Sequence, residues 1–247
     1  MSPWADRPHA AAVIMDYDGT LAAIVDDPAE ARPVDGALDV LAALAKKLSV
    51  VAVVSGRPVQ FLISQLGAVP GLLLSGIYGL EQQHGGRRAI RPGALDWAPA
   101  ISEAADAAQR EAPPGVRVER KGLSFVLHTR KHPGTWAWAT DWATSRAAAS
   151  GLRAQTGRMA IELLPPLEVD KGTVVGELAS TVDAVCYVGD DIGDLPAFSA
   201  LSRMREKGKR TLAVGVTSAE QPEALAEAVD VLVEGPLGAL ELLRRFL

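Results

Sequence analysis

The stretch Val13-Ile14-Met15-Asp16-Tyr17-Asp18-Gly19-Thr20-Leu21 decides how this chain can fold. It joins a short apolar run, residues 11–15, to two aspartates that are one residue apart. A brief apolar run closed by turn-forming residues is typical of a buried strand. The two carboxylates would then stand at the carboxyl end of that strand, where open α/β sheets bind their ligands.

Asp16 and Asp18 are too close together to suit an apolar core, because buried like charges repel each other. Two such carboxylates do suit a divalent cation, which binds oxygen ligands. Gly19 lets the backbone turn sharply beside them. A solvated loop remains an alternative, since Asp and Gly are also common in loops that follow strands.

The same stretch resembles the signature Asp-x-Asp-Gly-Thr of the haloacid dehalogenase-like (HAD) phosphatases. The resemblance implies that Asp16 attacks phosphorus and that Asp18 is the general acid and base. It also implies that further motifs of that family should follow later in the chain.

Composition predicts a folded, soluble protein. Of the 247 residues 48% are hydrophobic, which is enough for a core, and the net charge of −5 argues against a general nucleic-acid binder. Cys186 is the only cysteine and lies in an apolar run, so we expect a buried free thiol. We expect no secretory signal, and the sequence has no apolar run of the roughly 20 residues that a membrane span needs. We expect a cytoplasmic monomer without nucleic-acid or membrane partners.

Apolar runs and helical periodicity alternate along most of the chain, which predicts a parallel sheet with helices on both faces. The expected strands of this part are 11–15, 49–54, 72–74, 184–188, 211–216 and 231–233. The expected helices are 36–47, one after Pro58, 173–179, 195–204, 219–228 and 237–246. The fold class is therefore α/β, with a Rossmann-like, doubly wound parallel sheet over 1–87 and 167–247.

In the segment 88–166 the predicted strands and helices no longer alternate one by one. It predicts helices at 98–111 and 136–149, paired strands at 116–120 and 123–130, and a strand at 158–164. Helices combined with paired strands indicate a small α+β domain inserted into the α/β core. Alternation places one set of apolar side chains on the sheet face under the helices: Val116, Val118, Leu123, Phe125, Leu127, Met159, Ile161 and Leu163.

Four polar clusters stand at the ends of predicted strands or just before helices: Asp16 with Asp18, Ser55, Lys171, and Asp190 with Asp191 and Asp194. The carboxyl ends of parallel strands share one edge, so these clusters can meet there. Each cluster has a plainer explanation as well. Ser55 could cap the next helix, Lys171 could be a surface lysine, and the three aspartates could form a solvated turn.

Together the clusters suit the hydrolysis of a phosphate monoester. Mg²⁺ held by Asp16, the main-chain carbonyl of Asp18 and Asp190 would offset the charge of the dianionic substrate. Asp16 would attack phosphorus and form an aspartyl phosphate. Asp18 would protonate the leaving alcohol and then activate water.

The other groups would bind the transferring phosphoryl group. Ser55 and the amides near Gly19 and Gly56 would donate hydrogen bonds to its oxygens, and Lys171 would supply a point charge. The supporting carboxylates, which would hold Lys171 or metal-bound waters in place, are Asp191 and Asp194.

The order of these clusters matches the four motifs of the HAD phosphatases, and that family carries its type-2 cap between the positions of Ser55 and Lys171. The finer resemblance is to the trehalose-6-phosphate phosphatases, through Asp16–Leu21, Ser55-Gly56-Arg57, Lys121-Gly122-Leu123-Ser124, Glu162-Leu163-x-Pro165, Asp170-Lys171-Gly172 and Gly189-Asp190-Asp191-x-x-Asp194. It implies Mg²⁺-dependent hydrolysis of trehalose 6-phosphate to trehalose and phosphate. Tyr78 departs from the pattern, because this family usually has a His there.

The resemblance and the strand alternation together predict where the sugar binds. The expected substrate-binding residues, besides Gly19 and Gly56, are Arg57, Lys121, His128, Arg130 and Glu162. The polar sheet face of the inserted domain could instead simply be hydrated. Other functions stay open: a phosphatase for another sugar phosphate (sucrose phosphate or a glycosyl-phosphoglycerate), a sugar phosphomutase, or a non-catalytic regulatory module.

Overall fold

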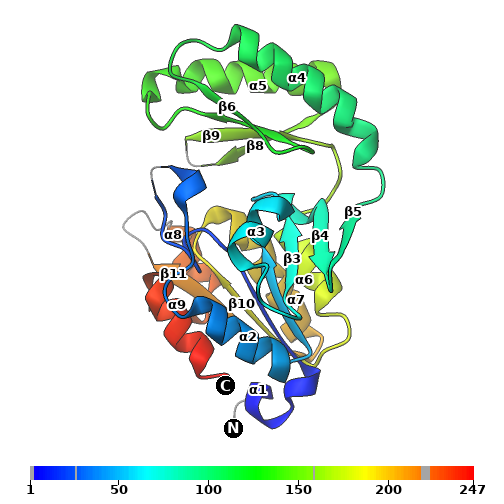
Figure 1. The fold of residues 1–247 in the computed structure, drawn as a ribbon, viewed down its shortest axis with the longest axis vertical. Helices are drawn as coiled ribbons and strands as arrows, with labels where there is room; N and C mark the ends of the chain where they lie inside the picture. The colour runs from blue at the N-terminus through cyan, green and yellow to red at the C-terminus, as the bar shows by residue number, and fades with distance from the viewer. Residues whose placement is uncertain (1–2, 26, 158, 218–222) are drawn as a thin grey trace. The chain divides into compact units, whose positions relative to one another are not determined.

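The computed structural model describes residues 3–25, 27–157, 159–217 and 223–247, and the chain forms two compact units (Figure 1). Unit 1 contains Met1–Ala89 and Val169–Leu247, and unit 2 is the continuous segment Ile90–Glu168. The sequence predicts an inserted domain over 88–166. Each observed boundary of unit 2 lies two residues later in the chain than the predicted one.

The sheet of unit 1 is formed by β1 (Ala11–Met15), β2 (Val50–Val54), β3 (Leu73–Gly76), β4 (Glu81–His84), β5 (Arg87–Ile90), β10 (Ala184–Gly189), β11 (Arg210–Thr217) and β12 (Val231–Glu234). Their order is β12-β11-β10-β1-β2-β3-β4-β5, and the six strands from β12 to β3 are parallel. This is the doubly wound order, with β1 beside β10 at the switch point. The predicted Rossmann-like core is confirmed.

Helices cover both faces of this sheet (Figure 1). One face carries α2 (Ala37–Lys47), α3 (Val59–Leu66) and α9 (Gly235–Arg244), and the other carries α6 (Lys171–Leu178) and α7 (Leu195–Glu206). Two shorter helices are α1 (Pro3–Asp6) and α8 (Glu223–Ala228). The predicted helix 219–228 agrees with α8 from Glu223 on, and its first four residues lie outside the described part of the chain.

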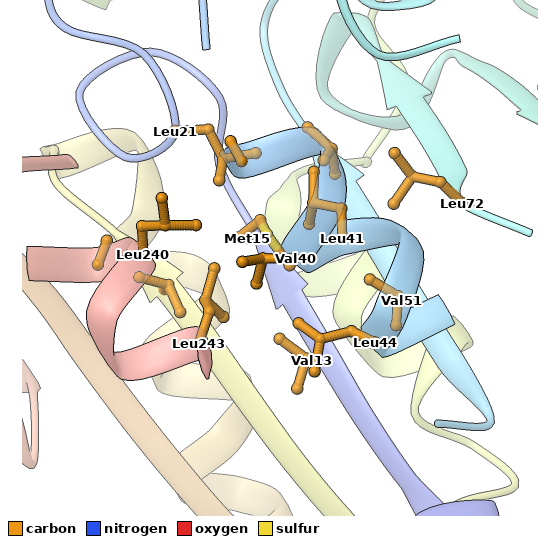
Figure 2. Packing of buried hydrophobic residues seen from close by; sticks show 14 of the residues in the cluster. Val13, Met15, Leu21, Val40, Leu41, Leu44, Val51, Leu72, Leu240 and Leu243 are labelled. Carbon is orange, nitrogen blue, oxygen red and sulfur yellow. The ribbon is translucent and has the colours of Figure 1, made fainter. Parts of the chain in front are cut away.

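The five residues of β1 are all fully buried, which explains why this strand has no polar residue before Asp16. Its side chains alternate between the two faces. Val13 and Met15 pack against α2 and α9, as Figure 2 shows. Val13 and Met15 therefore anchor the helices of this face, and all five side chains of β1 are buried at the centre of the sheet.

The antiparallel pair β4–β5 at the edge of the sheet is absent from the sequence-based prediction. Its residues are mostly polar and half-buried or exposed, so they show no apolar run. The usable signal was the pair Gly85-Gly86, whose φ angles of 55° and 76° suit a tight hairpin turn. The predicted strand 72–74 is also too short, because β3 continues to Gly76.

Unit 2 is a four-stranded antiparallel sheet with two helices. The elements are α4 (Ala98–Glu111), β6 (Arg117–Arg120), β7 (Phe125–His128), α5 (Trp136–Ser150), β8 (Arg153–Gly157) and β9 (Ala160–Leu164), with strand order β6-β7-β9-β8. The small side chains of α4, Ala104, Ala105 and Ala108, belong to the core that the sheet and both helices share. Strand β8 was also missed by the sequence-based prediction. The predicted first residue of the 158–164 strand, Arg158, lies outside the described residues.

The predicted apolar face of unit 2 is correct for most of its residues but not for all of them. Six of the eight residues belong to the cluster or pack on it: Val116, Val118, Phe125, Leu127, Ile161 and Leu163. Leu123 and Met159 lie outside it, because both stand in turns where strand alternation no longer applies. Val126 is buried on the opposite face, where it pairs with Glu162.

Two further expectations concern single features. Cys186 is a buried free thiol, as predicted. Among the described helices, none combines the length and the hydropathy that a membrane crossing requires.

Candidate functional site

The carboxyl ends of β1 and β10 place two aspartates side by side. Met15 and Val188 are paired in register, and the amide of Asp16 donates to the carbonyl of Val188 at 2.9 Å. Asp16 follows β1 directly and Asp190 follows β10. The switch point of the sheet therefore carries a carboxylate on each of its two strands, as ligand sites of open α/β sheets require.

Asp16, Asp190 and Asp194 form a buried cluster of carboxylates. Each offers an oxygen atom within 4.8 Å of those of the other two, and none is more than 6% exposed. Burial and the neighbouring carboxylates raise the pKa of Asp16 to about 7, although Lys171 opposes this, and they raise the pKa of Asp190 to about 8. A solvated turn of Asp190, Asp191 and Asp194 is therefore excluded for Asp190 and Asp194, which are buried, whereas Asp191 is half-buried.

Lys171 joins two of these carboxylates. Its Nζ lies 2.8 Å from Asp16 Oδ2 and 2.6 Å from Asp194 Oδ1, and the residue is only 4% exposed. Burial alone would lower the pKa of Lys171, but the two carboxylates outweigh burial and raise it well above its usual value. Lys171 is therefore a buried, charged lysine and not a surface residue.

The start of α6 brings Lys171 into the cluster. The Asp170 carboxylate caps this helix by accepting hydrogen bonds from the amide and the hydroxyl of Thr173, at 2.7 and 2.9 Å. Gly172 allows α6 to touch the start of α7, because a Cβ atom there would lie 2.3 Å from the carbonyl oxygen of Pro196. The sequence alone carries no sign of this contact of Gly172.

Asp194 accepts hydrogen bonds from four donors. Oδ1 accepts from Lys171 Nζ at 2.6 Å and from the Tyr187 hydroxyl at 2.5 Å, and Oδ2 accepts from the amides of Asp190 and Asp191 at 3.0 Å. Asp194 therefore fixes both Lys171 and the backbone after β10. The contact to Tyr187 was not predicted. Asp191 is less buried and accepts from the amide of Ile192.

The cluster suits a divalent cation. Asp16 Oδ1 and Asp190 Oδ1 are buried and, within the described residues, have no hydrogen-bond partner. Three ionised carboxylates against one lysine would leave two negative charges in a buried site. Oxygen ligands with excess negative charge are what Mg²⁺ prefers in proteins. Asp16 and Asp190 are the side chains that could hold it, and the side chain of Asp18 lies elsewhere.

Two glycines are required by the close packing of this site. Gly19 has φ 75°, and a Cβ atom on it would lie 2.1 Å from Asp190 Oδ2. A Cβ atom on Gly189 would lie 2.4 Å from Asp194 Cγ. Gly189, at the end of β10, was part of a motif in the sequence but received no role there. Its contact with Asp194 could be found only in three dimensions.

Asp18 is bound by Arg57. The guanidinium donates from Nε to Asp18 Oδ2 and from Nη2 to Oδ1, both at 2.7 Å, and it also lies 4.4 Å from the ring centroid of Phe61. The sequence predicts Arg57 as a substrate-binding residue, and in this structure its guanidinium holds the candidate general acid. Such a bidentate pair fixes both the position and the orientation of a carboxylate.

Ser55 does not cap α3. Its hydroxyl accepts from the amide of Arg57 at 3.2 Å, and the residue is 1% exposed. The α3 amide at Val59 instead donates to Glu81 Oε2 at 2.9 Å. The alternative explanation of Ser55 as a helix cap is therefore wrong, and Glu81 was missed as the group that binds the start of α3.

The polar sheet face of unit 2 contains two linked pairs. Glu162 accepts from Lys121 Nζ at 3.1 Å and from the Ser124 hydroxyl at 2.5 Å, and both charged side chains are less than 10% exposed. His128 Nε2 lies 2.6 Å from Glu119 Oε2 and lowers the pKa of Glu119 to about 2. Arg130 is exposed. The Lys121–Glu162 pair is buried, so this part of the face is not simply hydrated.

Known proteins are similar to this chain over most of its length. A family model described as trehalose-phosphatase matches residues 14–229. A trehalose-phosphate phosphatase of Mycobacterium leprae (strain TN) is 36% identical over 211 residues, covering 77% of this chain and 47% of that protein. A second one, from Mycobacterium avium (strain 104), is 38% identical over 204 residues, covering 77% and 51%. The chain thus spans about half the length of these curated relatives.

A solved structure extends the likeness to the fold. A trehalose-6-phosphate phosphatase related protein superposes with a TM-score of 0.80 at 21% identity, covering 95% of this chain and 96% of that one. At this level of identity the similarity concerns the arrangement of the strands and helices alone.

Proposed function

Because this chain belongs to the trehalose-phosphatase family, we propose that it hydrolyses trehalose 6-phosphate to trehalose and phosphate, as a phosphoric monoester hydrolase with Asp16 as the nucleophile. The observation that carries the proposal is the buried group of Asp16, Lys171, Asp190 and Asp194 at the switch point of the sheet. A regulatory module has no need to keep three carboxylates and a lysine buried together, at a cost in desolvation.

In the first half of the reaction a carboxylate oxygen of Asp16 forms a bond to phosphorus while the bond from phosphorus to the sugar oxygen breaks. Asp18 gives a proton to that oxygen, so that the sugar leaves as a neutral alcohol. In the second half Asp18 takes a proton from water, whose oxygen bonds to phosphorus and releases Asp16. Arg57 orients Asp18 for both proton transfers through its bidentate contact.

The charges around Asp16 favour its attack. Lys171 stabilises the ionised form of Asp16 and supplies positive charge to the phosphoryl group, and Asp194 keeps Lys171 in position. Mg²⁺, when bound by Asp16, Asp190 and the main-chain carbonyl of Asp18, would offset the negative charge of the substrate. Ser55 and the amides near Gly19 and Gly56 would bind the phosphoryl oxygens, with Asp191 in a supporting role.

Unit 2 is the part that we propose as the cap domain, with contacts to the sugar. Lys121 and Glu162 present donors and acceptors that match sugar hydroxyl groups, and the pair is held in place by Ser124. His128 and Arg130 would extend this polar face. Sugar phosphates are charged and do not cross membranes unaided, so we propose that the enzyme works in the cytoplasm.

Phosphate release from a panel of sugar phosphates tests the proposal. With Mg²⁺ present, trehalose 6-phosphate should give the highest kcat/KM among trehalose 6-phosphate, sucrose phosphate and a glycosyl-phosphoglycerate. Asp16→Asn is the matched control, since it keeps the shape of the side chain and removes the nucleophile. Preferred hydrolysis of another member would reassign the substrate, and return of the phosphoryl group to a sugar would identify a phosphomutase.

A further inference from the structure

The turn that follows β3 has a strained backbone. Ile77, Tyr78 and Gly79, which form the short helix η3 (Ile77–Gly79), have φ angles of 46°, 56° and 102°. Positive φ is disfavoured for all residues with a Cβ atom, and most of all for a β-branched one such as Ile77. Strain of this kind persists only where the surrounding structure enforces it, and it is concentrated at functional sites.

This turn is enforced by hydrogen bonds to the loop that begins at Ser55. The amide of Ile77 donates to the carbonyl of Arg57, and the amide of Tyr78 donates to the carbonyl of Ser55, both at 3.0 Å. The amide of Ser55 in turn donates to the carbonyl of Ser75 at 2.9 Å. Both ends of the segment 55–57 are therefore bound to the backbone around the strained turn.

The side chain of Tyr78 lies directly against the middle of the same segment. A Cβ atom at Gly56 would lie 2.7 Å from the Tyr78 hydroxyl oxygen and 2.8 Å from its Cζ atom. A Cβ atom at Gly76 would likewise lie 2.5 Å from the amide nitrogen of Val59 and 2.7 Å from the carbonyl oxygen of Arg57. The two glycines thus permit a close contact that any larger residue would prevent.

The segment 55–57 carries two groups that the reaction needs. Ser55 supplies a buried hydroxyl, and Arg57 supplies the guanidinium that holds Asp18. We infer that Tyr78 is a positioning residue for this segment: pressed against Gly56 by the left-handed turn, it fixes Ser55 and, through Arg57, the carboxylate of Asp18. This inference rests on the proposed phosphatase function. It adds that Tyr78 orders the loop 55–57, which would bind the phosphoryl group.

Tyr78→Gly tests the inference, because glycine tolerates positive φ and removes the ring. We expect kcat to fall by about ten- to hundredfold, as for a misplaced catalytic group. The loss should be equal on trehalose 6-phosphate and on p-nitrophenyl phosphate, since both use the same loop. The relieved strain should keep the melting temperature close to that of the parent protein. Amide hydrogen exchange over 55–59 should become faster. Tyr78→Phe, which keeps the ring, should stay within about threefold of the parent protein.

Gly56→Ala adds a double-mutant test of the direct contact. Alone it should lower kcat, because the new Cβ atom would collide with Tyr78. In the Tyr78→Gly background the same change should have little further effect, because the space is then free. Losses that simply multiply, unchanged exchange over 55–59, or a Tyr78→Gly variant as active as the parent would overturn the inference.

The two substrates keep this inference separate from the proposed function. A parent protein that cleaves p-nitrophenyl phosphate but not trehalose 6-phosphate would refute the proposed substrate, and the effect of Tyr78→Gly would still be measured on the aryl phosphate. A parent protein that cleaves neither would refute the phosphatase function, and the inference would fall with it.

Discussion

Asp194→Asn should destabilise the protein strongly although it changes only one atom. The carboxylate of Asp194 accepts four hydrogen bonds, and it is fully buried. An amide at this position has one oxygen and one NH₂ group. The oxygen of the new Asn side chain can still accept the hydrogen bonds from the amides of Asp190 and Asp191. Its NH₂ group then points at Lys171 and Tyr187.

The magnitude follows from what each partner can do. Tyr187 can rotate its hydroxyl and accept from the NH₂ group, but Lys171 has only donors and loses this hydrogen bond. A hydrogen bond to a charged group contributes about 1.5–3 kcal/mol. The two backbone bonds also lose their charge-assisted strength, so the total loss in the free energy of unfolding should be about 2–4 kcal/mol. At about 2–4 °C per kcal/mol for a chain of this size, the melting temperature should fall by about 5–15 °C.

Thermal and urea unfolding in the presence of a chelator measure this loss without any contribution from bound metal. Asp191→Asn is the matched control, because Asp191 is less buried and an Asn can still accept from the amide of Ile192. It should cost less than about 1 kcal/mol. If Asp194→Asn is no less stable than Asp191→Asn, then Asp194 does not act as the common acceptor of the site.

Four further outcomes are expected, one each for the nucleophile, the cation site, the turn after β1 and the polar face of unit 2. Asp16→Asn should abolish turnover while the circular dichroism spectrum stays that of the folded parent protein. Phosphate release above roughly a few per cent of the parent rate would contradict covalent catalysis by Asp16. Chelation should abolish activity and Mg²⁺ should restore it, and Asp190→Ala should raise the Mg²⁺ concentration needed for half-maximal activity; full activity in excess chelator would exclude this cation site. Gly19→Ala should displace Asp190 and add a strained φ that costs about 1–3 kcal/mol, measured by unfolding and by Mg²⁺ titration, whereas Gly193→Ala, whose Cβ atom would meet nothing within 4 Å, should change neither quantity. Lys121→Ala should lower kcat/KM on trehalose 6-phosphate by about ten- to hundredfold and on p-nitrophenyl phosphate by little, because it removes a charged hydrogen bond worth about 1.5–3 kcal/mol; equal losses on both substrates would show that Lys121 does not contact the sugar.

The parts of the fold that were predictable are those in which burial imposes a pattern. Strand β1 is apolar throughout because both of its faces are covered, and its bounds match the predicted ones. Helix α4 also matches, because its apolar residues recur at helical spacing beside a polar face. Strands β4, β5 and β8 were missed because they lie near the edges of their sheets, where a polar residue on either face costs little.

The site was predictable as a set of residue types but not as a set of contacts. The sheet topology brings Asp16, Lys171 and Asp190 together once the strands are known, and that much follows from the sequence. The contact between Arg57 and Asp18 depends on how one loop is bent by its neighbours. A strained turn such as Ile77-Tyr78 carries no sequence signal, because its residues are the wrong ones for positive φ.

The central position of β1 has a consequence for how the protein is made. β1 pairs with β10 from Ala11↔Ala184 onward, so its partner strand lies 173 residues later in the chain. At a synthesis rate of about 5–20 residues per second, an apolar strand waits roughly 9–35 s on the ribosome with one edge unpaired. Unit 2, a continuous segment with its own core, completes its last strand at Leu164, before β10 begins at Ala184. During synthesis the part of the molecule most exposed to misassociation is therefore the strand that ends at Asp16.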